Sequence, residues 1–214
     1  MPVSVQASAQ IAEPMEILRR TPDVLRALLA GLPDSWTDTP DTPDGWRPRD
    51  VVGHLITGEL TDWLARTHRI LEDGTDRAFD RFDRHAMLER DRGASLDELL
   101  DQFAALRAKN LAEFASLVSD DDLAQLGMHP SLGEVTLDNL LNTWAVHDLD
   151  HVGQIFAGLA GSHDADVGPW KKYLGMLLRR TDPAAVAASA ASPREASRST
   201  SRSGAAASRL SWRS

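Results

Sequence analysis

The stretch "AVHDLDHVGQIF", residues 145–156, holds the side chains best suited to chemistry in this sequence. His147 and His151 are four residues apart, and residues with this spacing share one face of a helix. Two imidazoles on one face can bind the same metal ion. The same spacing is also found in histidine pairs that hydrogen-bond to a nearby acid without any metal. The pair alone leaves both interpretations open.

A helical wheel for residues 136–160 places both histidines at the edge of the apolar face. Asp148 falls inside that face, whereas Asp150 falls on the solvent side. A buried carboxylate needs a hydrogen-bonding or charged partner, so we expect Asp148 to have one. Gln154 lies beside His147, two turns further along the wheel. The apolar face itself comprises Leu137, Leu140, Leu141, Trp144, Val152, Ile155 and Leu159.

A metal site on these histidines needs a third ligand from another helix, and His54 in "DVVGHLITGELTDW" is the best candidate. On its own wheel, however, His54 points away from Trp63 and from most of the apolar residues. It can point inward only if its helix is buried on more than one side or if it lies at an open end of the domain. Glu59, on the apolar side, is a second carboxylate that needs a partner. The other histidines lie in polar or loop contexts, and we expect them at the surface: His68, His85, His129 and His163.

Apolar residues recur at helical spacing along most of the chain, and no alternating pattern predicts a strand. Four amphipathic helices in one acidic domain indicate an all-α fold, a four-helix bundle. Ser95 and Glu98 form a capping box at the start of the third helix. The expected helices span residues 13–32, 48–72, 95–119 and 136–160, with a short one over 168–180.

Composition and charge limit the possible functions. The 214 residues include no Cys, so the chain offers no disulfide, thiol nucleophile or thiolate ligand. A net charge of −9 argues against nucleic acid as a partner of the bundle. The apolar runs are shorter than the ~20 residues that span a bilayer, and the N-terminus lacks the pattern of a secretory signal. We therefore expect a cytoplasmic protein without a membrane partner.

The charge divides the chain into two parts. Residues 187–214 contain five Arg and one Glu, a net charge of +4, so the rest carries −9 − 4 = −13. The Ala, Ser and Arg residues there have almost nothing to bury, which is typical of disorder. We expect a bundle domain over residues 12–180 and a disordered tail over residues 181–214.

Two segments together resemble the DinB/YfiT-like family of the DinB-like four-helix bundle superfamily. They are "WRPRDVVGHLITGELTDWLARTHRIL" (46–71) and "TWAVHDLDHVGQI" (143–155). The resemblance extends over about residues 12–180. It implies an up-down-down-up bundle, often a homodimer, with one divalent ion held by His54, His147 and His151. Relatives in the family include thiol S-transferases that use bacillithiol and mycothiol-dependent isomerases, and some were first described as metal-dependent hydrolases.

A centre of three neutral imidazoles would leave an open position on the ion, as in catalytic sites. The leading hypothesis is transfer of a low-molecular-weight thiol onto a small electrophilic substrate. The thiol would come from a co-substrate, because this chain has no Cys. Asp148, Glu59 and Gln154 are candidates to orient the imidazoles or receive a proton. Each could equally form a helix-to-helix hydrogen bond, and no other catalytic residue is evident.

Two alternatives remain. One is metal-dependent hydrolysis of a small ester or amide, with water as the nucleophile. The other is a non-enzymatic helical dimer that binds a metal or a ligand. The pattern His147-Asp148-x-x-His151 disfavours a protease, because its acid is Asp and its third ligand lies upstream on another helix. Imidazole ligands favour zinc or nickel over magnesium or calcium. Residues 33–47 and 75–94 could line the mouth of the site, because loops carry specificity. For the charged stretch "DRAFDRFDRHAMLERD" (76–91) the favoured interpretation is instead a solvated surface helix.

Overall fold

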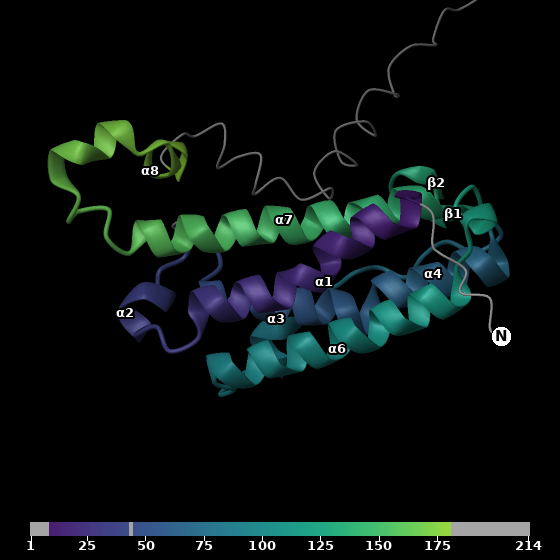
Figure 1. Ribbon diagram of the computed structural model, residues 1–214, viewed down its shortest axis with the longest axis horizontal. Coiled ribbons are helices and arrows are strands. Elements are labelled where there is room, and N and C mark those ends of the chain that lie inside the picture. The colour runs from purple at the N-terminus through teal and green to yellow at the C-terminus, as the bar shows by residue number, and fades with distance from the viewer. Residues whose placement is uncertain (1–8, 43–44, 181–214) are drawn as a thin grey trace, which may run out of the picture.

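Four long helical stretches lie side by side in the computed structural model, which describes residues 9–42 and 45–180 (Figure 1). The first and last run in one direction, and the two between them run in the other (Figure 1). This is the expected up-down-down-up four-helix bundle. The predicted disordered tail, residues 181–214, lies outside the described residues. The stretches are α1 (Ala9–Leu29), α3 (Pro48–Thr61) followed by α4 (Trp63–Asp73), α6 (Leu96–Leu117) and α7 (Leu137–Gly161).

Helix starts follow the local sequence. Pro48 occupies the first turn of α3, where its missing N–H costs nothing. At α6, the Ser95 hydroxyl accepts the backbone N–H of Glu98 at 3.2 Å, and the Glu98 carboxylate accepts that of Ser95 at 2.8 Å. The predicted capping box is thus present, and it satisfies backbone donors that the helix itself leaves free.

The helix predicted over residues 48–72 is wrong in one respect, because it is interrupted at Asp62. That residue has φ −116° and ψ −71°, outside regular helical geometry. Just before it, the hydroxyl groups of Thr57 and Thr61 donate to the carbonyl oxygens of residues four positions earlier, at 3.0 and 2.9 Å. Such bonds compete with the helical ladder and bend helices. The interruption changes the direction in which α4 side chains point relative to those of α3.

A short antiparallel hairpin connects α6 to α7, although the sequence predicted no strand. It pairs β1 (Leu126–His129) with β2 (Gly133–Thr136). Strands of four residues are too short to produce a recognisable alternation, so the sequence gives little signal for them. The hairpin packs on α4: a Cβ on Gly127 would lie 2.5 Å from Ile70.

Shorter elements close the ends of the bundle. The predicted helix 168–180 is two pieces, a 3₁₀ segment (Gly168–Tyr173) and α8 (Gly175–Arg180). Leu174 separates them, with φ −103° and ψ 85°. The remaining short elements are α2 (Asp34–Thr37), α5 (Ala86–Arg90) and a 3₁₀ turn (Asp120–Asp122).

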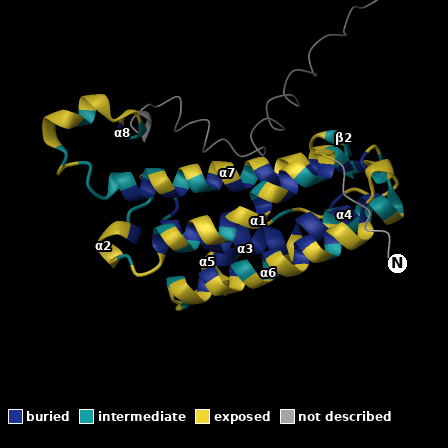
Figure 2. Ribbon diagram, in the orientation of Figure 1, coloured by how far each residue is buried: buried dark blue, intermediate teal, exposed yellow. Residues whose placement is uncertain are grey.

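Helix α3 is the most enclosed element (Figure 2). Every residue from 51 to 59 is buried, whatever its direction on the helix. It contacts α4, α5, α6 and α7, so it has packing partners on several sides. A helix in this position brings polar side chains into the interior even when they lie opposite its most apolar face.

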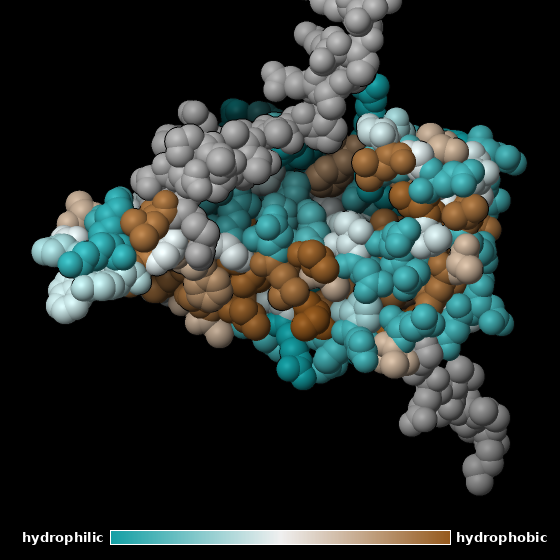
Figure 3. Space-filling model, turned by 90° about the horizontal axis from the view of Figure 1, so that it is seen from above, coloured by the Kyte–Doolittle hydropathy of each residue, from teal (hydrophilic) through white to brown (hydrophobic). Residues whose placement is uncertain are grey.

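The outward face of α7 is partly apolar, as the view from that side shows (Figure 3). Val146, Leu149 and Phe156 expose 63%, 52% and 39% of their surface there. Among the described residues, no helix combines the length and the apolar character needed to cross a membrane.

Candidate metal centre

Three histidines from two helices meet in the middle of the bundle. The Nε2 atom of His147 lies 3.3 Å from Nε2 of His54 and 3.0 Å from Nε2 of His151. One ring nitrogen from each of the three lies within 4.8 Å of the others. The described part of the chain contains no second group of three such side chains. The structure thus brings together the three residues singled out in the sequence.

Hydrogen bonds at Nδ1 orient two of these rings. Nδ1 of His54 donates to the backbone carbonyl oxygen of Arg84 at 3.3 Å, and Nδ1 of His151 donates to Oε1 of Gln154 at 2.7 Å. Since a carbonyl oxygen only accepts, Nδ1 carries the proton in both rings. The Nε2 lone pairs of these neutral rings therefore face the centre. The expectation that Gln154 orients an imidazole agrees with this geometry.

The environment keeps all three rings neutral. Burial, followed by the charge of His151, lowers the pKa of His54 to about 3. Burial, together with the neighbouring histidines, lowers the pKa of His147 to about 2. Burial also lowers the pKa of His151. Neutral imidazole is the form that binds a metal, so near pH 7 no proton has to be displaced.

The donor set fits a divalent ion. Imidazole nitrogens at roughly 2.0–2.1 Å from a tetrahedral zinc ion are about 3.3 Å apart, and the observed distances are 3.0 and 3.3 Å. Without an ion, at most one N–H, on Nε2 of His147, is available to the three converging Nε2 atoms, because the other two rings carry their N–H on Nδ1. Nδ1 of His147 is buried and has no hydrogen-bond partner in the described part of the chain.

The position of His54 differs from what its helical wheel suggested, and the fold explains why. Its side chain points inward because α3 is buried all round, which was the condition under which it could be a ligand. The comparison with Trp63 also assumed one continuous helix, whereas Asp62 interrupts it. Trp63 itself meets the site, with its ring centre 5.1 Å from that of His147. His54 and Trp63 therefore lie on the same side of the structure.

Aromatic and basic side chains border the three histidines. The ring of Trp46 is centred 4.7 Å from that of His54, and the ring of Phe82 is 5.3 Å from it, edge to face. The guanidinium carbon of Arg84 lies 4.9 Å from the centre of the Trp46 ring. Trp46 belongs to segment 33–47, and Phe82 and Arg84 to segment 75–94. Both segments were considered for the mouth of the site. Of the surface helix favoured for residues 76–91, only α5, Ala86–Arg90, is present.

A buried ionic cluster lies in the same bundle core. Arg107, from α6, donates to Glu59 at 2.8 Å and makes two hydrogen bonds to Asp148, at 2.5 and 2.9 Å. Asn110 and Trp144 also donate to the Glu59 carboxylate, at 2.9 and 3.1 Å. Burial disfavours the charged guanidinium, yet Asp148 and then Glu59 raise the pKa of Arg107 above its usual value. The cluster joins one guanidinium to two carboxyl groups, and burial raises the pKa of Glu59 although Arg107 opposes this.

Asp148 and Glu59 thus have partners, as expected, but the partner is Arg107. Among the described residues, neither acid hydrogen-bonds to any of the three imidazoles. Both instead form hydrogen bonds between helices, which was the alternative to a role in orienting the imidazoles. Arg107 was not among the residues predicted from the sequence. A usable signal exists: Phe103, Arg107 and Leu111 are each four residues apart, which places a lone charge within an apolar face.

The remaining histidines are away from this centre. His68 pairs with Glu113 at 3.0 Å, and His163 pairs with Asp166 at 2.9 Å. His129 is partly buried in β1. His85 is exposed, as expected, although its ring is 5.8 Å from that of Trp46 at the border of the site.

Comparisons with known proteins agree with this architecture. A curated protein of Geobacillus thermodenitrificans (strain NG80-2), named provisionally as a metal-dependent hydrolase, is 36% identical over 73 residues. This alignment covers 32% of the chain and 41% of the relative, so the chain spans less than half of that protein. YfiT from Bacillus subtilis, also provisionally described as a metal-dependent hydrolase, has an unusual four-helix bundle topology.

YfiT and this chain share the fold, with a TM-score of 0.62 at 24% sequence identity. The match covers 75% of this chain and 91% of YfiT. The model of the DinB superfamily matches residues 17–155, well over half of the sequence, and that range includes all three histidines of the centre. The chain therefore belongs to the DinB superfamily.

Proposed function

We propose that this chain is a divalent-metal-dependent enzyme that acts on a small molecule at His54, His147 and His151. The observation that carries the proposal is the convergence of three neutral imidazoles, with Nε2 atoms 3.0 and 3.3 Å apart. When bound there, a divalent ion supplies Lewis acidity, which lowers the pKa of a water or a thiol. Three protein donors leave a further coordination position for that nucleophile.

Hydrolysis of a small ester or amide is the first candidate reaction. It is supported by the provisional description of both relatives as metal-dependent hydrolases. Water would attack the carbonyl carbon, and its proton would pass to the leaving group. The backbone carbonyl of Arg84 and the side chain of Gln154 hold two of the imidazoles, those of His54 and His151, in the ligating tautomer.

Transfer of a low-molecular-weight thiol is the second candidate, and the engagement of both buried acids favours it. Glu59 and Asp148 are occupied by Arg107, so neither is free to serve as a general base. A thiol, with an ordinary pKa of about 8.5, needs less help in losing its proton than water does. The thiol sulfur would form a bond to carbon, while the leaving group departs with its electron pair. The thiol must be a co-substrate, because the chain contains no Cys.

Metal content is the first test. We expect elemental analysis of the purified protein to find about one zinc or nickel ion per chain. His54→Ala, His147→Ala and His151→Ala should each lose it, whereas His163→Ala, which changes a histidine away from the centre, should keep it. Full metal content in all three variants would exclude this centre.

Activity assays separate the reactions. Metal-loaded protein is given 4-nitrophenyl acetate without thiol, and 1-chloro-2,4-dinitrobenzene with bacillithiol, mycothiol or glutathione. Ester cleavage without thiol supports hydrolysis, and metal-dependent thioether formation supports transfer. If a metal is bound but neither reaction occurs, the non-enzymatic helical dimer becomes the better explanation. The homodimer itself stays a prediction, to be measured by light scattering.

A further inference from the structure

An arginine that forms no ion pair with any described acid lies beside the metal centre, in a group of three side chains that we call the entrance: Trp46, Phe82 and Arg84. The guanidinium carbon of Arg84 is 4.9 Å from the Trp46 ring centre, and the side chain is only partly buried. No acid in residues 9–42 or 45–180 forms an ion pair with it. After burial, its charge is one of the contributions that lower the pKa of His54, so the guanidinium lies close to the imidazoles.

The nearby acids of the same segment are engaged elsewhere. Asp80 pairs with Arg69 at 3.3 Å. Asp83 accepts the backbone N–H of His85 at 3.0 Å. The positive charge of Arg84 is therefore not neutralised by its own segment, in a protein whose net charge is −9.

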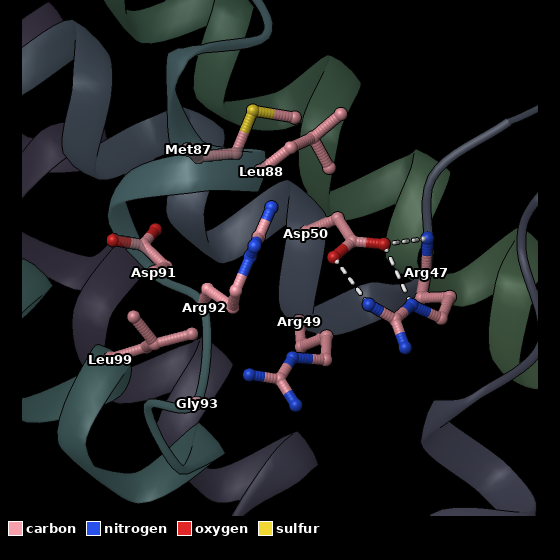
Figure 4. Close-up of a pocket in the computed structure, with 9 residues that line it drawn as sticks. All are labelled: Arg47, Arg49, Asp50, Met87, Leu88, Asp91, Arg92, Gly93 and Leu99. Atoms are coloured by element: carbon pink, nitrogen blue, oxygen red, sulfur yellow. Dashed lines mark hydrogen bonds and ion pairs between the residues drawn. The ribbon is translucent and has the colours of Figure 1, made fainter.

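The arginines that line another cavity differ from Arg84, because their guanidinium groups have acceptors. That cavity has a volume of about 170 Å³ at the start of α3, and none of the three histidines lines it (Figure 4). Its Arg47 pairs with Asp50 at 2.8 Å, and its Arg92 pairs with Glu89 at 2.7 Å. Its Arg49 donates to a backbone carbonyl oxygen at 2.5 Å. Each of these guanidinium groups has an acceptor within the chain, whereas among residues 9–42 and 45–180 the guanidinium of Arg84 contacts only an aromatic face.

The entrance has a defined shape. The ring of Trp46 is 4.7 Å from that of His54 and stacks over His151 at 6.4 Å. Phe82 presents an edge to His54 at 5.3 Å. The contact of Arg84 with the Trp46 ring orients the guanidinium, and no acceptor in the part of the chain that the structure describes binds its N–H groups. Two aromatic rings and one cation thus lie beside the histidines of the centre.

We infer that the centre takes small molecules with an anionic group on a flat, apolar body. The anion pairs with Arg84, the body packs against Trp46 and Phe82, and the reacting bond faces the three histidines. The placement of the reacting bond rests on the proposed function, whereas the pairing with Arg84 and the packing against the two aromatic rings concern binding alone. Aromatic and unsaturated carboxylates or sulfonates have this chemistry. Two N–H groups of one guanidinium match such an anion in a bidentate manner.

A matched pair of probes tests the charge preference. Benzenesulfonate and methyl phenyl sulfone share a phenyl ring and a sulfonyl group, and only the first is charged. We expect zinc-loaded protein to bind benzenesulfonate about tenfold more tightly in calorimetric titrations, as a charge-assisted hydrogen bond would give. In Arg84→Gln the preference should fall to about twofold or less, with the affinity for the sulfone unchanged.

Three controls keep the result specific. The carbonyl oxygen that holds His54 belongs to the backbone of Arg84, so Arg84→Gln should retain its full metal content. Arg84→Lys, which keeps the charge, should retain part of the preference. Arg81→Gln removes an exposed arginine of the same segment and should behave as the wild type.

The outcomes separate this inference from the proposed function. If wild-type protein shows no preference, or binds neither probe at millimolar concentration, the inference is wrong. It is also wrong if Arg84→Gln keeps the preference. If the preference depends on Arg84 but no ester or thiol acceptor is turned over, the inference stands and the proposed function fails.

Discussion

Gln154 illustrates how a single residue controls the candidate centre. Its Oε1 accepts the Nδ1–H of His151 at 2.7 Å, which leaves the Nε2 lone pair of that ring free for an ion. Gln154 belongs to the same helix, three residues beyond His151, so α7 fixes the position of the two side chains relative to each other. Such outer hydrogen bonds are expected to affect metal affinity nearly as much as the ligands do.

We predict that Gln154→Ala weakens metal affinity by about tenfold or more, because the ring of His151 can then rotate and change tautomer. Competition with a chromogenic chelator measures the affinity. Gln102→Ala, on the exposed face of α6, is the matched control. Equal affinities in the two variants would show that the hydrogen bond to Gln154 does not orient the ligand.

Asp62 is a second residue with a testable property. Burial raises the pKa of its carboxyl to about 6, although the charge of Arg66 opposes this. In the unfolded chain the group loses its proton near pH 4. Between about pH 4 and pH 6 the folded state therefore binds more protons, and the free energy of unfolding falls as the pH rises.

We predict that Asp62→Asn loses this dependence. Relative to the variant, wild-type protein should become less stable by about 2 kcal/mol between pH 4 and pH 7, because the unfolded carboxyl is already partly ionised at pH 4. Urea titrations of both metal-free proteins at the two pH values measure the difference. A difference independent of pH would mean that the carboxyl titrates in its ordinary range.

At the scale of elements, the junction of α3 and α4 places an aromatic ring against the centre. Gly58 has no side chain, and a Cβ there would lie 2.8 Å from Nε1 of Trp63. Trp63 stacks on Trp144 at 5.6 Å and meets His147 edge to face at 5.1 Å. The break after α3 and Gly58 within α3 thus allow Trp63 to pack against His147, one of the three histidines of the centre.

We predict that Gly58→Ala displaces Trp63, lowers stability by about 1–3 kcal/mol and weakens metal affinity. Gly153→Ala is the control, because a Cβ at that helical glycine meets nothing within 4 Å. The control should be neutral or slightly stabilising. Urea unfolding and metal titration of both variants provide the comparison. Unchanged metal affinity in Gly58→Ala would show that the Trp63 contact does not position His147.

The Arg107 cluster connects four long helices. Arg107 of α6 binds Glu59 of α3 and Asp148 of α7, and it also donates to the backbone carbonyl oxygen of Leu18 in α1 at 2.9 Å. Arg107→Met would leave two buried carboxylates without a cation, and we expect a loss of about 3–5 kcal/mol. Combining it with Glu59→Gln and Asp148→Asn should recover part of that loss. If Arg107→Met alone unfolds at the same urea concentration as the wild type, the cluster contributes nothing to stability.

For the whole molecule, metal binding should couple to stability. The three ligands come from two helices that are far apart in sequence, so the centre forms only in the folded chain. A metal that binds the folded state at a hundred times its dissociation constant adds about 2.7 kcal/mol to the free energy of unfolding. We predict that zinc or nickel raises the midpoint of thermal unfolding, and that His54→Ala abolishes the rise. An equal rise in the variant would place the ion elsewhere.

Much of this arrangement was predictable from the sequence. Helical spacing of apolar residues indicated the long helices, and the wheel of α7 correctly placed Asp148 inside and both histidines at the core edge. These features depend on neighbours within one helix, where the geometry is regular. Sequence periodicity did not predict the hairpin, because its strands have only four residues each, and it did not predict the break at Asp62.

Only the tertiary structure decided which side chains meet. On its own wheel His54 pointed away from the apolar face, and it is the burial of α3 on several sides that brings it to His147 and His151. Asp148 and Glu59 each needed a partner, and the packing of α6 supplied Arg107 to both. Trp46 and Arg84 reach the centre from separate loops. Contacts between segments distant in sequence depend on how the helices pack, and the periodicity of one helix contains no information about its neighbours.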